Sequence, residues 1–255
     1  MYKTLTAEDY KSFLGLPSDY RVDGMLSYGT WDRVKQTEIF KTLLKKSGKN
    51  FEYGALPSFL AQVLEFNIEG KRYWFDVSYG GALLSEYLHL ACLFGSKKNI
   101  LLGSCGGLSP KVSSLDLILP TFSFGNESAT RMYDPDAVDH RHASDAALTQ
   151  RLIKKINPKY KVWQGDTTTC QAMMAETLED VQNWSKEGFL AVEMEAATIF
   201  AVSKHFQVPA AAILFVGDNL VKGEMVTSEG YQNNSEAKEE VRNEQYRVAL
   251  EELLA

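Results

Sequence analysis

Three acidic residues directly follow apolar runs in this chain. Glu193 and Glu195 come at the end of the run 189–192, and Asp218 comes after the run 208–216. A buried carboxylate needs hydrogen-bond partners, and the neighbouring hydroxyls of a sugar diol supply two at once. A carboxyl group at the end of a buried strand has a raised pKa in a dry site and can then act as a general acid.

Each acidic residue also has an alternative explanation. Acidic residues favour the first turn of a helix, and Asp218 with Asn219 is typical of a turn. On a continuous helix Glu193 and Glu195 would diverge, whereas in an extended segment they share a face. If a helix begins at or after Glu195, we expect both carboxylates to border one pocket.

Segment 103–107, Gly-Ser-Cys-Gly-Gly, is a third candidate and follows the apolar run 99–102. We expect a turn in which backbone N–H groups converge and the Ser104 hydroxyl adds a donor, which predicts an anion cradle. The segment lacks the glycine and lysine spacing of ATP loops and the glycine fingerprint of dinucleotide sites. A tight turn without a ligand is the alternative.

The elements that must position these residues alternate along the chain. Strands are expected at 24–29, 59–66, 73–77, 99–103, 115–120, 160–164, 189–192 and 208–216, with a hairpin turn at 69–71. Helices are expected at 30–48, 83–94, 148–156, 178–184, 195–206 and from about 235 to the C-terminus. This order predicts an α/β sandwich with a largely parallel sheet and helices on both sides. Ligands of such sheets bind beyond the carboxyl ends of the strands, where all three candidate segments lie.

Composition narrows the function classes. The chain has 255 residues, 45% of them hydrophobic and 24% charged, as in ordinary globular proteins. No apolar run approaches the roughly 18 residues of a membrane span, and the N-terminus has no signal-peptide core, so we expect a cytoplasmic protein without membrane contact. Because 27 basic residues face 33 acidic ones without a basic stripe, nucleic acid is not an expected partner.

The cysteines indicate neither a metal site nor a disulfide framework. Cys92, Cys105 and Cys170 are far apart and odd in number, so we interpret them as small buried residues and expect no metal. No linker or repeat interrupts the chain, and residues 1–255 are expected to form one domain.

Four segments together resemble the nucleoside phosphorylase family. They are LGSCGGL at 102–108, LDLILP at 115–120, AVEMEAA at 191–197 and AAILFVGDN at 211–219. The family includes purine nucleoside and uridine phosphorylases, and nucleosidases that act on AMP or on methylthioadenosine and adenosylhomocysteine. The match runs from about residue 24 to the C-terminus, while a divergent N-terminal segment of about 20 residues resembles nothing we can name. The resemblance implies a three-layer αβα sandwich with a central mixed sheet, assembled as a homo-oligomer, either a dimer or a trimer of dimers.

The resemblance also implies roles for the residues of a nucleoside site. Glu195 would hold the ribose hydroxyls, Met194 would line the sugar and Glu193 would support them. Asp218 matches the acid that protonates N7 of a purine, whereas uridine phosphorylases carry a Gln and Arg pair that we do not find after Thr169. The base pocket is expected near Met173 and Met174, although a pair of methionines also fills cores.

The implied phosphate site departs from the family pattern at several positions. Phosphate would bind at Gly29, Arg33, Gly103 and Ser104, although an arginine at an exposed helix start is also common. Hexameric purine phosphorylases have an arginine where this chain has Leu101 and a serine where it has Gly217. An arginine that assists the acid falls near Tyr231 and has no match. The absence of one arginine removes a charge-assisted phosphate contact, which favours a hydrolytic activity over a phosphorolytic one.

The expected activity is phosphorolysis of a purine nucleoside to the free base and ribose 1-phosphate or its deoxy analogue, in purine salvage. Inorganic phosphate is the co-substrate, and no cofactor is expected. A hydrolytic nucleosidase and a non-catalytic nucleoside-binding relative are the alternatives.

Overall fold

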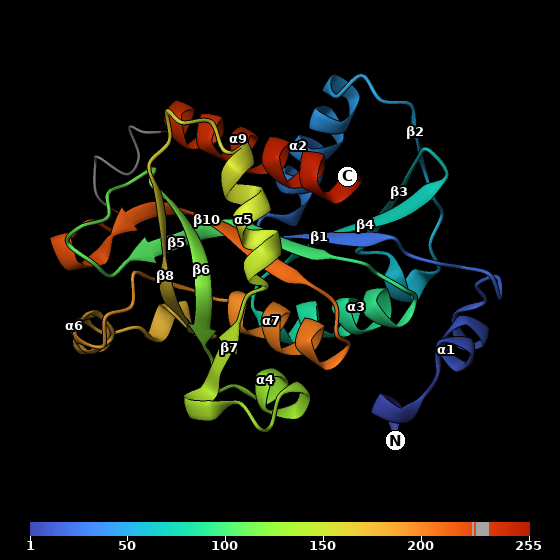
Figure 1. The fold of residues 1–255 in the computed structure, drawn as a ribbon, viewed down its shortest axis with the longest axis horizontal. Helices are drawn as coiled ribbons and strands as arrows, with labels where there is room; N and C mark the ends of the chain where they lie inside the picture. Colours follow the sequence, from blue (N-terminus) through green and yellow to red (C-terminus); the bar gives the residue numbers. More distant parts are fainter. Residues whose placement is uncertain (226, 228–234) are drawn as a thin grey trace.

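A ten-stranded mixed sheet forms the middle layer of the protein, for which a computed structural model describes residues 1–225, 227 and 235–255 (Figure 1). The strands are β1 (Gly24–Gly29), β2 (Phe51–Tyr53), β3 (Leu64–Ile68), β4 (Lys71–Ser78), β5 (Asn99–Gly107), β6 (Leu117–Phe124), β7 (Arg141–Ala143), β8 (Val162–Thr169), β9 (Ala191–Glu193) and β10 (Ala210–Asn219). Their order is β10-β6-β8-β9-β5-β1-β4-β3-β2, and β7 pairs with β6.

The centre of the sheet is parallel. Strand β1 pairs in parallel with β4 and β5, and β5 pairs in parallel with β10. The antiparallel pairs are β2 with β3, β3 with β4, β5 with β9, β6 with β7 and β6 with β10. Because β10 also pairs with β5, the strands β10, β6, β8, β9 and β5 form a closed circuit of pairings.

Helices cover both faces of the sheet, which confirms the three-layer αβα sandwich with a mixed sheet (Figure 1). One face carries α2 (Arg33–Lys46), α5 (Ala146–Lys155) and α9 (Ser235–Leu254), and the other carries α3 (Gly81–Leu93) and α7 (Ala196–His205). The remaining helices are α1 (Ala7–Leu14), α4 (Ser128–Tyr133) and α6 (Leu178–Lys186). No helix in this described part is long and apolar enough to cross a membrane.

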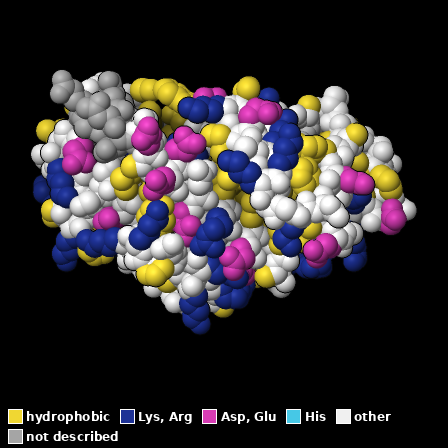
Figure 2. Space-filling view, turned by 90° about the horizontal axis from the view of Figure 1, so that it is seen from above, with side chains coloured by type: hydrophobic (Ala, Val, Ile, Leu, Met, Phe, Trp, Pro, Cys, Tyr) yellow, Lys and Arg dark blue, Asp and Glu magenta, His cyan; other side chains and the backbone are white. Residues whose placement is uncertain are grey.

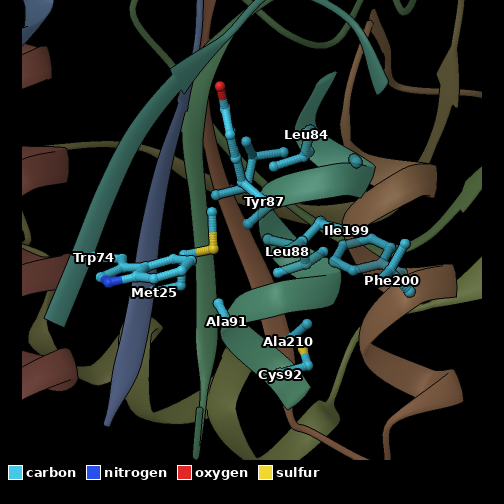
Figure 3. Close-up of a cluster of buried hydrophobic side chains, with 14 of the residues drawn as sticks. Met25, Trp74, Leu84, Tyr87, Leu88, Ala91, Cys92, Ile199, Phe200 and Ala210 are labelled. Carbon is cyan, nitrogen blue, oxygen red and sulfur yellow. The ribbon is translucent and has the colours of Figure 1, made fainter. Parts of the chain in front are cut away.

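Two apolar cores hold the layers together, one on each side of the sheet. On the α3 side, Met25 and Trp74 of the strands face Leu84 and Leu88 of α3, beside Phe200 of α7 (Figure 3). On the α9 side, Phe40 stacks on Phe75 with ring centroids 4.0 Å apart. Fully burying each such side chain stabilises the fold by about 1.5 to 3 kcal/mol.

The surface over α9 mixes charges of both signs. In Figure 2, Lys and Arg side chains alternate with Asp and Glu side chains over this face, with no continuous basic stripe.

Several expected boundaries are wrong for local reasons. The expected strand 59–66 is a 3-10 turn at Ser58–Leu60 followed by β3, since Pro57 sets up the turn. The hairpin itself is confirmed, because Glu69 and Gly70 have φ of 54° and 76°, as a two-residue turn requires. Helix α2 begins at Arg33, where Asp32 rather than Thr30 caps it.

The sequence interpretation missed four short elements: α1, β2, α4 and β7. Of these, α1 had a readable signal, because Thr6 and Asp9 form a reciprocal capping box at its start. This helix lies in the divergent N-terminal segment, where Leu14 joins the α3-side core. Tyr10 of α1 also meets His89 of α3 edge to face, with ring centroids 5.7 Å apart.

Candidate active site

The segment between β9 and α7 positions two buried carboxylates, as the sequence predicts. Glu193 ends β9 and Glu195 immediately precedes α7, so the chain is not helical between them. Glu193 Oε2 accepts hydrogen bonds from the backbone N–H of Glu195 at 2.7 Å and of Ala196 at 2.6 Å. Its Oε1 accepts from the Thr169 hydroxyl at 2.5 Å. The Glu193 side chain therefore caps the first turn of α7 and fixes the position of the segment that contains Glu195.

Glu195 points instead towards the ends of β1 and β4. Its Oε1 accepts a hydrogen bond from the Gly80 backbone N–H at 2.6 Å. Its Oε2 lies so close to Gly29 that a Cβ at residue 29 would stand 2.3 Å from it. Gly29 thus provides the space for this carboxylate, and Glu195 keeps lone pairs that can accept from a ligand.

Burial raises the pKa of both carboxyl groups. Hydrogen bonds from Thr169 and from two backbone N–H groups oppose this shift at Glu193. At Glu195 burial is the largest cause, and the negative charge of Glu193 raises its pKa further. Glu193 is the better supported of the two carboxylates, and Glu195 is the one that gains most from new hydrogen-bond donors.

Gln171 fixes this corner of the site, and sequence reasoning missed it. Its Oε1 accepts from the Gly81 N–H at 2.8 Å, and its Nε2 donates to the Met194 carbonyl at 2.8 Å. The side chain thereby ties the start of α3 to the residue before Glu195. No sequence pattern announced this role, because both partners are backbone groups of distant segments. Met194 itself is half-buried.

Asp218 lies within β10, not in a turn after it. The strand continues to Asn219, with an irregularity between Val216 and Asp218 where it pairs with β5. The sequence interpretation ended the strand at Val216, since Gly-Asp-Asn is typical of a turn. Asp218 is 9% exposed. Burial raises its pKa to about 6, Lys238 of α9 opposes the shift and Glu224 adds to it.

Lys238 was not expected near this acid. It is buried on α9, and its pKa is lowered by burial and raised by the charge of Asp218. The sequence interpretation looked for an assisting cation near Tyr231, which lies outside the described residues. Lys238 follows Asp218 by twenty residues and lies on a separate helix, so the two residues form no recognisable sequence motif. Their proximity can be seen only in the folded structure.

The segment from Met173 to Glu176 connects the surroundings of the two acids. The Tyr79 hydroxyl contacts the Met173 sulfur at 4.0 Å, and burial, followed by the charge of Glu195, raises the pKa of Tyr79. Glu176 follows the 3-10 turn Met173–Ala175, and burial and then the charge of Asp218 raise its pKa. Met173 contacts Tyr79, and its assignment to the base pocket stays a prediction. Met174 is 81% exposed, so it fills no core and buries little surface.

Cys105 also links the two acids, from beneath the site. It is buried, and after burial the charges of Glu193 and Asp218 are the causes that raise its pKa. Cys92 is buried too, whereas Cys170 is only partly buried, so the expectation of buried cysteines holds for two of the three.

The glycine-rich segment is a strand, and the expected turn with converging amides is wrong. Residues 103–107 continue β5 and pair with both β10 and β9. Gly103 lies opposite Gly29, the last residue of β1. Ser104 lies one residue past that end and is exposed. The glycines instead allow close packing, since a Cβ at Gly106 would stand 2.8 Å from Leu220.

Arg33 lies at the start of α2, close to the end of β1. The residue as a whole is half-buried, and its Nη1 is buried with no hydrogen-bond partner in the described part of the chain. A buried donor without a partner costs about 1 to 3 kcal/mol. This atom is therefore suited to an anion that would supply the missing acceptor.

Much of the chain matches a family of known proteins. Residues 82–254 match the phosphorylase superfamily. The chain is 30% identical to purine nucleoside phosphorylase DeoD-type of Caldanaerobacter subterraneus subsp. tengcongensis over 57% of its own length and 63% of the relative's. It is 30% identical to the enzyme of that name from Actinobacillus succinogenes, over 69% of this chain and 68% of the relative. The chain thus spans less than two thirds of the Caldanaerobacter protein.

A solved structure extends the likeness to nearly the whole chain. The crystal structure of uridine phosphorylase from Vibrio fischeri ES114 superposes with a TM-score of 0.72 at 20% identity. The superposition covers 92% of this chain and 94% of that one. At this identity the likeness shows a shared fold, and it extends over the N-terminal third that the family match leaves out.

Proposed function

This chain belongs to the phosphorylase superfamily, and from that premise we propose that it cleaves the N-glycosidic bond of a purine nucleoside with inorganic phosphate as nucleophile. The observation that supports this proposal most is the placement of Glu195. Its buried carboxylate accepts a hydrogen bond from the Gly80 N–H, and it fits only because residue 29 is a glycine. Such a group accepts hydrogen bonds from two ribose hydroxyls.

Glu195 also meets the electrostatic need of the reaction. Breaking the bond between C1′ and the base leaves positive charge on the sugar, and a fixed anion nearby stabilises it. The diol hydroxyls favour the ionised form of Glu195, because each donates to the carboxylate. Glu193 supports this role by fixing the first turn of α7, and Met194 lines the sugar.

Asp218 is the proposed general acid. The C1′–N9 electron pair moves to the purine as the bond breaks, and the protonated Asp218 carboxyl donates its proton to N7. The raised pKa of about 6 suits this task, because a useful fraction of the group is still protonated near neutral pH. Met173 and the exposed Met174 are proposed to border the base. A pyrimidine has no N7, which is why a purine is proposed.

The phosphate site is proposed around the end of β1. The unpartnered Arg33 Nη1 supports it, together with Gly29, Gly103 and Ser104 at the neighbouring strand ends. One phosphate oxygen would form a bond to C1′, giving ribose 1-phosphate or its deoxy analogue. We also propose a homo-oligomer, as a dimer or trimer of dimers, and a cytoplasmic location, as the family resemblance implies.

Hydrolysis is the second candidate, and Leu101 favours it. This apolar residue is 1% exposed and lies on the strand that leads to Ser104. The proposed phosphate site therefore has one cation fewer than the site of hexameric purine phosphorylases, which have an arginine at this position. A non-catalytic binder is less well supported, since binding alone would not need a buried acid such as Asp218.

A panel of ribonucleosides tests the proposed function. Purified protein is incubated with phosphate and with inosine, guanosine, adenosine or uridine, and free base is measured by chromatography. We expect base from at least one purine nucleoside and none from uridine. Release of uracil alone would contradict the purine assignment, and no release from any nucleoside would favour the non-catalytic reading.

A further inference from the structure

The inner side of α9 contacts every segment that carries a residue of the proposed phosphate site. The helix lies over the sheet and packs on β1, β5 and β10 and on the neighbouring α2 (Figure 1). Gln245 and Tyr246 are fully buried on this side of the helix. Because buried polar groups need partners, the hydrogen bonds of these two side chains show what α9 holds in place.

Gln245 joins the two central strands β5 and β10. Its Nε2 donates to the Gly103 carbonyl at 2.9 Å and to the Ile213 carbonyl at 2.7 Å. Gly103 lies opposite Gly29 of β1 and directly precedes Ser104. The two N–H groups of one amide therefore fix the end of β5 from which Ser104 extends.

Tyr246 contacts the other two segments of the proposed phosphate site. Its ring stacks on the Tyr28 ring with centroids 5.4 Å apart, and Tyr28 directly precedes Gly29. Its hydroxyl donates to Gln36 Oε1 at 3.3 Å. Gln36 lies on α2, about one turn after Arg33. Adjacent residues of α9 thus reach the neighbours of all the proposed phosphate residues.

Packing alone does not account for a glutamine at position 245. The side chain is 0% exposed, and its Oε1 is buried with no hydrogen-bond partner among the described residues. A buried acceptor without a partner costs free energy, which a methionine of similar size would avoid. The donor bonds of Nε2 to the two strand carbonyls are what distinguishes glutamine from methionine here.

We propose that Gln245 is a positioning residue for phosphate. It holds the end of β5 against β10, so that Ser104 and the neighbouring Gly29 stand where phosphate binds. Strand β10 is buried along its whole length and serves as the fixed partner. Gln245 acts through the Gly103 carbonyl and does not touch phosphate itself. This inference rests on the proposed function, which puts phosphate at the ends of β1 and β5.

Gln245→Met tests the proposal, because it keeps the size of the side chain and removes both donors. Calorimetry gives the Kd of inorganic phosphate, and phosphorolysis of the best purine nucleoside gives kcat and the KM of each substrate. We expect Kd and KM for phosphate to rise by about tenfold, since a displacement of about 1 Å costs up to roughly a hundredfold. KM for the nucleoside should stay close to the wild-type value. A merely structural role would leave the ratio of the two KM values unchanged.

Asn99→Ala is the matched control at the opposite end of the same strand. Asn99 is a fully buried amide in the first residue of β5, and its Nδ2 donates to the Ser203 hydroxyl at 2.9 Å. The variant should lose stability in urea unfolding and keep the wild-type Kd and KM for phosphate. An equal rise in both variants would show a general loosening of β5 and would overturn the inference.

Gln245→Asn keeps an amide that is one methylene shorter, so it can reach at most one of the two carbonyls. We expect a smaller rise in Kd for phosphate than in Gln245→Met. An unchanged Kd in a folded Gln245→Met would overturn the inference, and so would an unchanged Kd in Gln245→Asn if the methionine variant does not fold. A wild type that binds no phosphate and releases base without it would instead contradict the proposed function, so the two failures are distinguishable.

Discussion

The carboxylate of Glu195 lies directly against the backbone of Gly29, with no room between them for a methyl group. The contact joins the first strand of the sheet to the segment before α7, and it sets where the carboxylate can point. Gly29, at the end of β1, was expected to bind phosphate. In the structure it also leaves the space that the Glu195 carboxylate occupies.

Gly29→Ala tests this contact. The new Cβ would meet Glu195 Oε2 at 2.3 Å, so the carboxylate must move. We expect a loss of about 1 to 3 kcal/mol in the free energy of unfolding, the range for overpacking. KM for the nucleoside should rise as well. Thermal and urea unfolding together with steady-state kinetics measure both effects.

The double variant Gly29→Ala/Glu195→Ala provides the control. If the clash with the carboxylate is the cause, removing that carboxylate should recover most of the lost stability, and the two effects should not add. Strictly additive losses would show that Gly29 acts through another neighbour.

Glu195→Ala should lower kcat/KM by roughly 30-fold to 900-fold in a protein that remains folded. The ribose diol loses its acceptor and the developing charge on the sugar loses its nearest anion. One preorganised group of this kind contributes about 2 to 4 kcal/mol to the transition state. The measurement is kcat/KM on a ribonucleoside, with circular dichroism to verify folding. Full turnover in this variant would contradict the ribose assignment.

Asp218→Asn separates acid catalysis from binding. An amide cannot transfer a proton, so cleavage of purine nucleosides should slow by roughly 10² to 10⁴. A riboside with a good leaving group, such as nitrophenyl riboside, should slow far less. Equal slowing of both substrates would remove Asp218 from the acid role.

The pH dependence of kcat/KM also tests whether Asp218 is the general acid. Asp218 acts as an acid only while protonated, and its pKa is raised to about 6. The kcat/KM of the wild type should therefore fall as pH rises through about 6, and that limb should be absent in Asp218→Asn. A limb that persists in the variant would assign the titration to another group.

Arg33→Ala should act mainly through phosphate. Loss of a charge-assisted contact should raise KM for phosphate by about tenfold to a hundredfold, with a small change in kcat. Lys35→Ala is the control, because Lys35 is an exposed cation in the same first turn of α2 and should leave that KM unchanged. A similar effect of both substitutions would indicate a general charge effect instead of a pocket.

Motifs predicted the parts of the site that depend on local sequence. Glu193 and Glu195 lie between a strand and a helix as expected, because Val-Glu-Met-Glu-Ala combines an apolar run with acidic residues and alanines. The alternation of strands and helices predicted an α/β sandwich with helices on both sides, and the family resemblance implied the three-layer αβα fold with a mixed sheet.

Residues whose roles depend on distant backbone groups could not be predicted. Gln171 binds the Gly81 N–H and the Met194 carbonyl, and neither partner leaves a trace in the sequence around residue 171. The segment 103–107 failed for another reason, because its glycines serve close strand packing where a turn was expected.

The central claim is that phosphate is the nucleophile in cleavage of a purine nucleoside, and product analysis tests it most directly. The purified protein is incubated with its best purine nucleoside in phosphate-free buffer and in buffer with phosphate, and the sugar product is identified by ³¹P NMR. The account predicts base release that depends on phosphate, with one ribose 1-phosphate formed per free base. Base released at the same rate without phosphate, with free ribose as co-product, would contradict it and identify a nucleosidase.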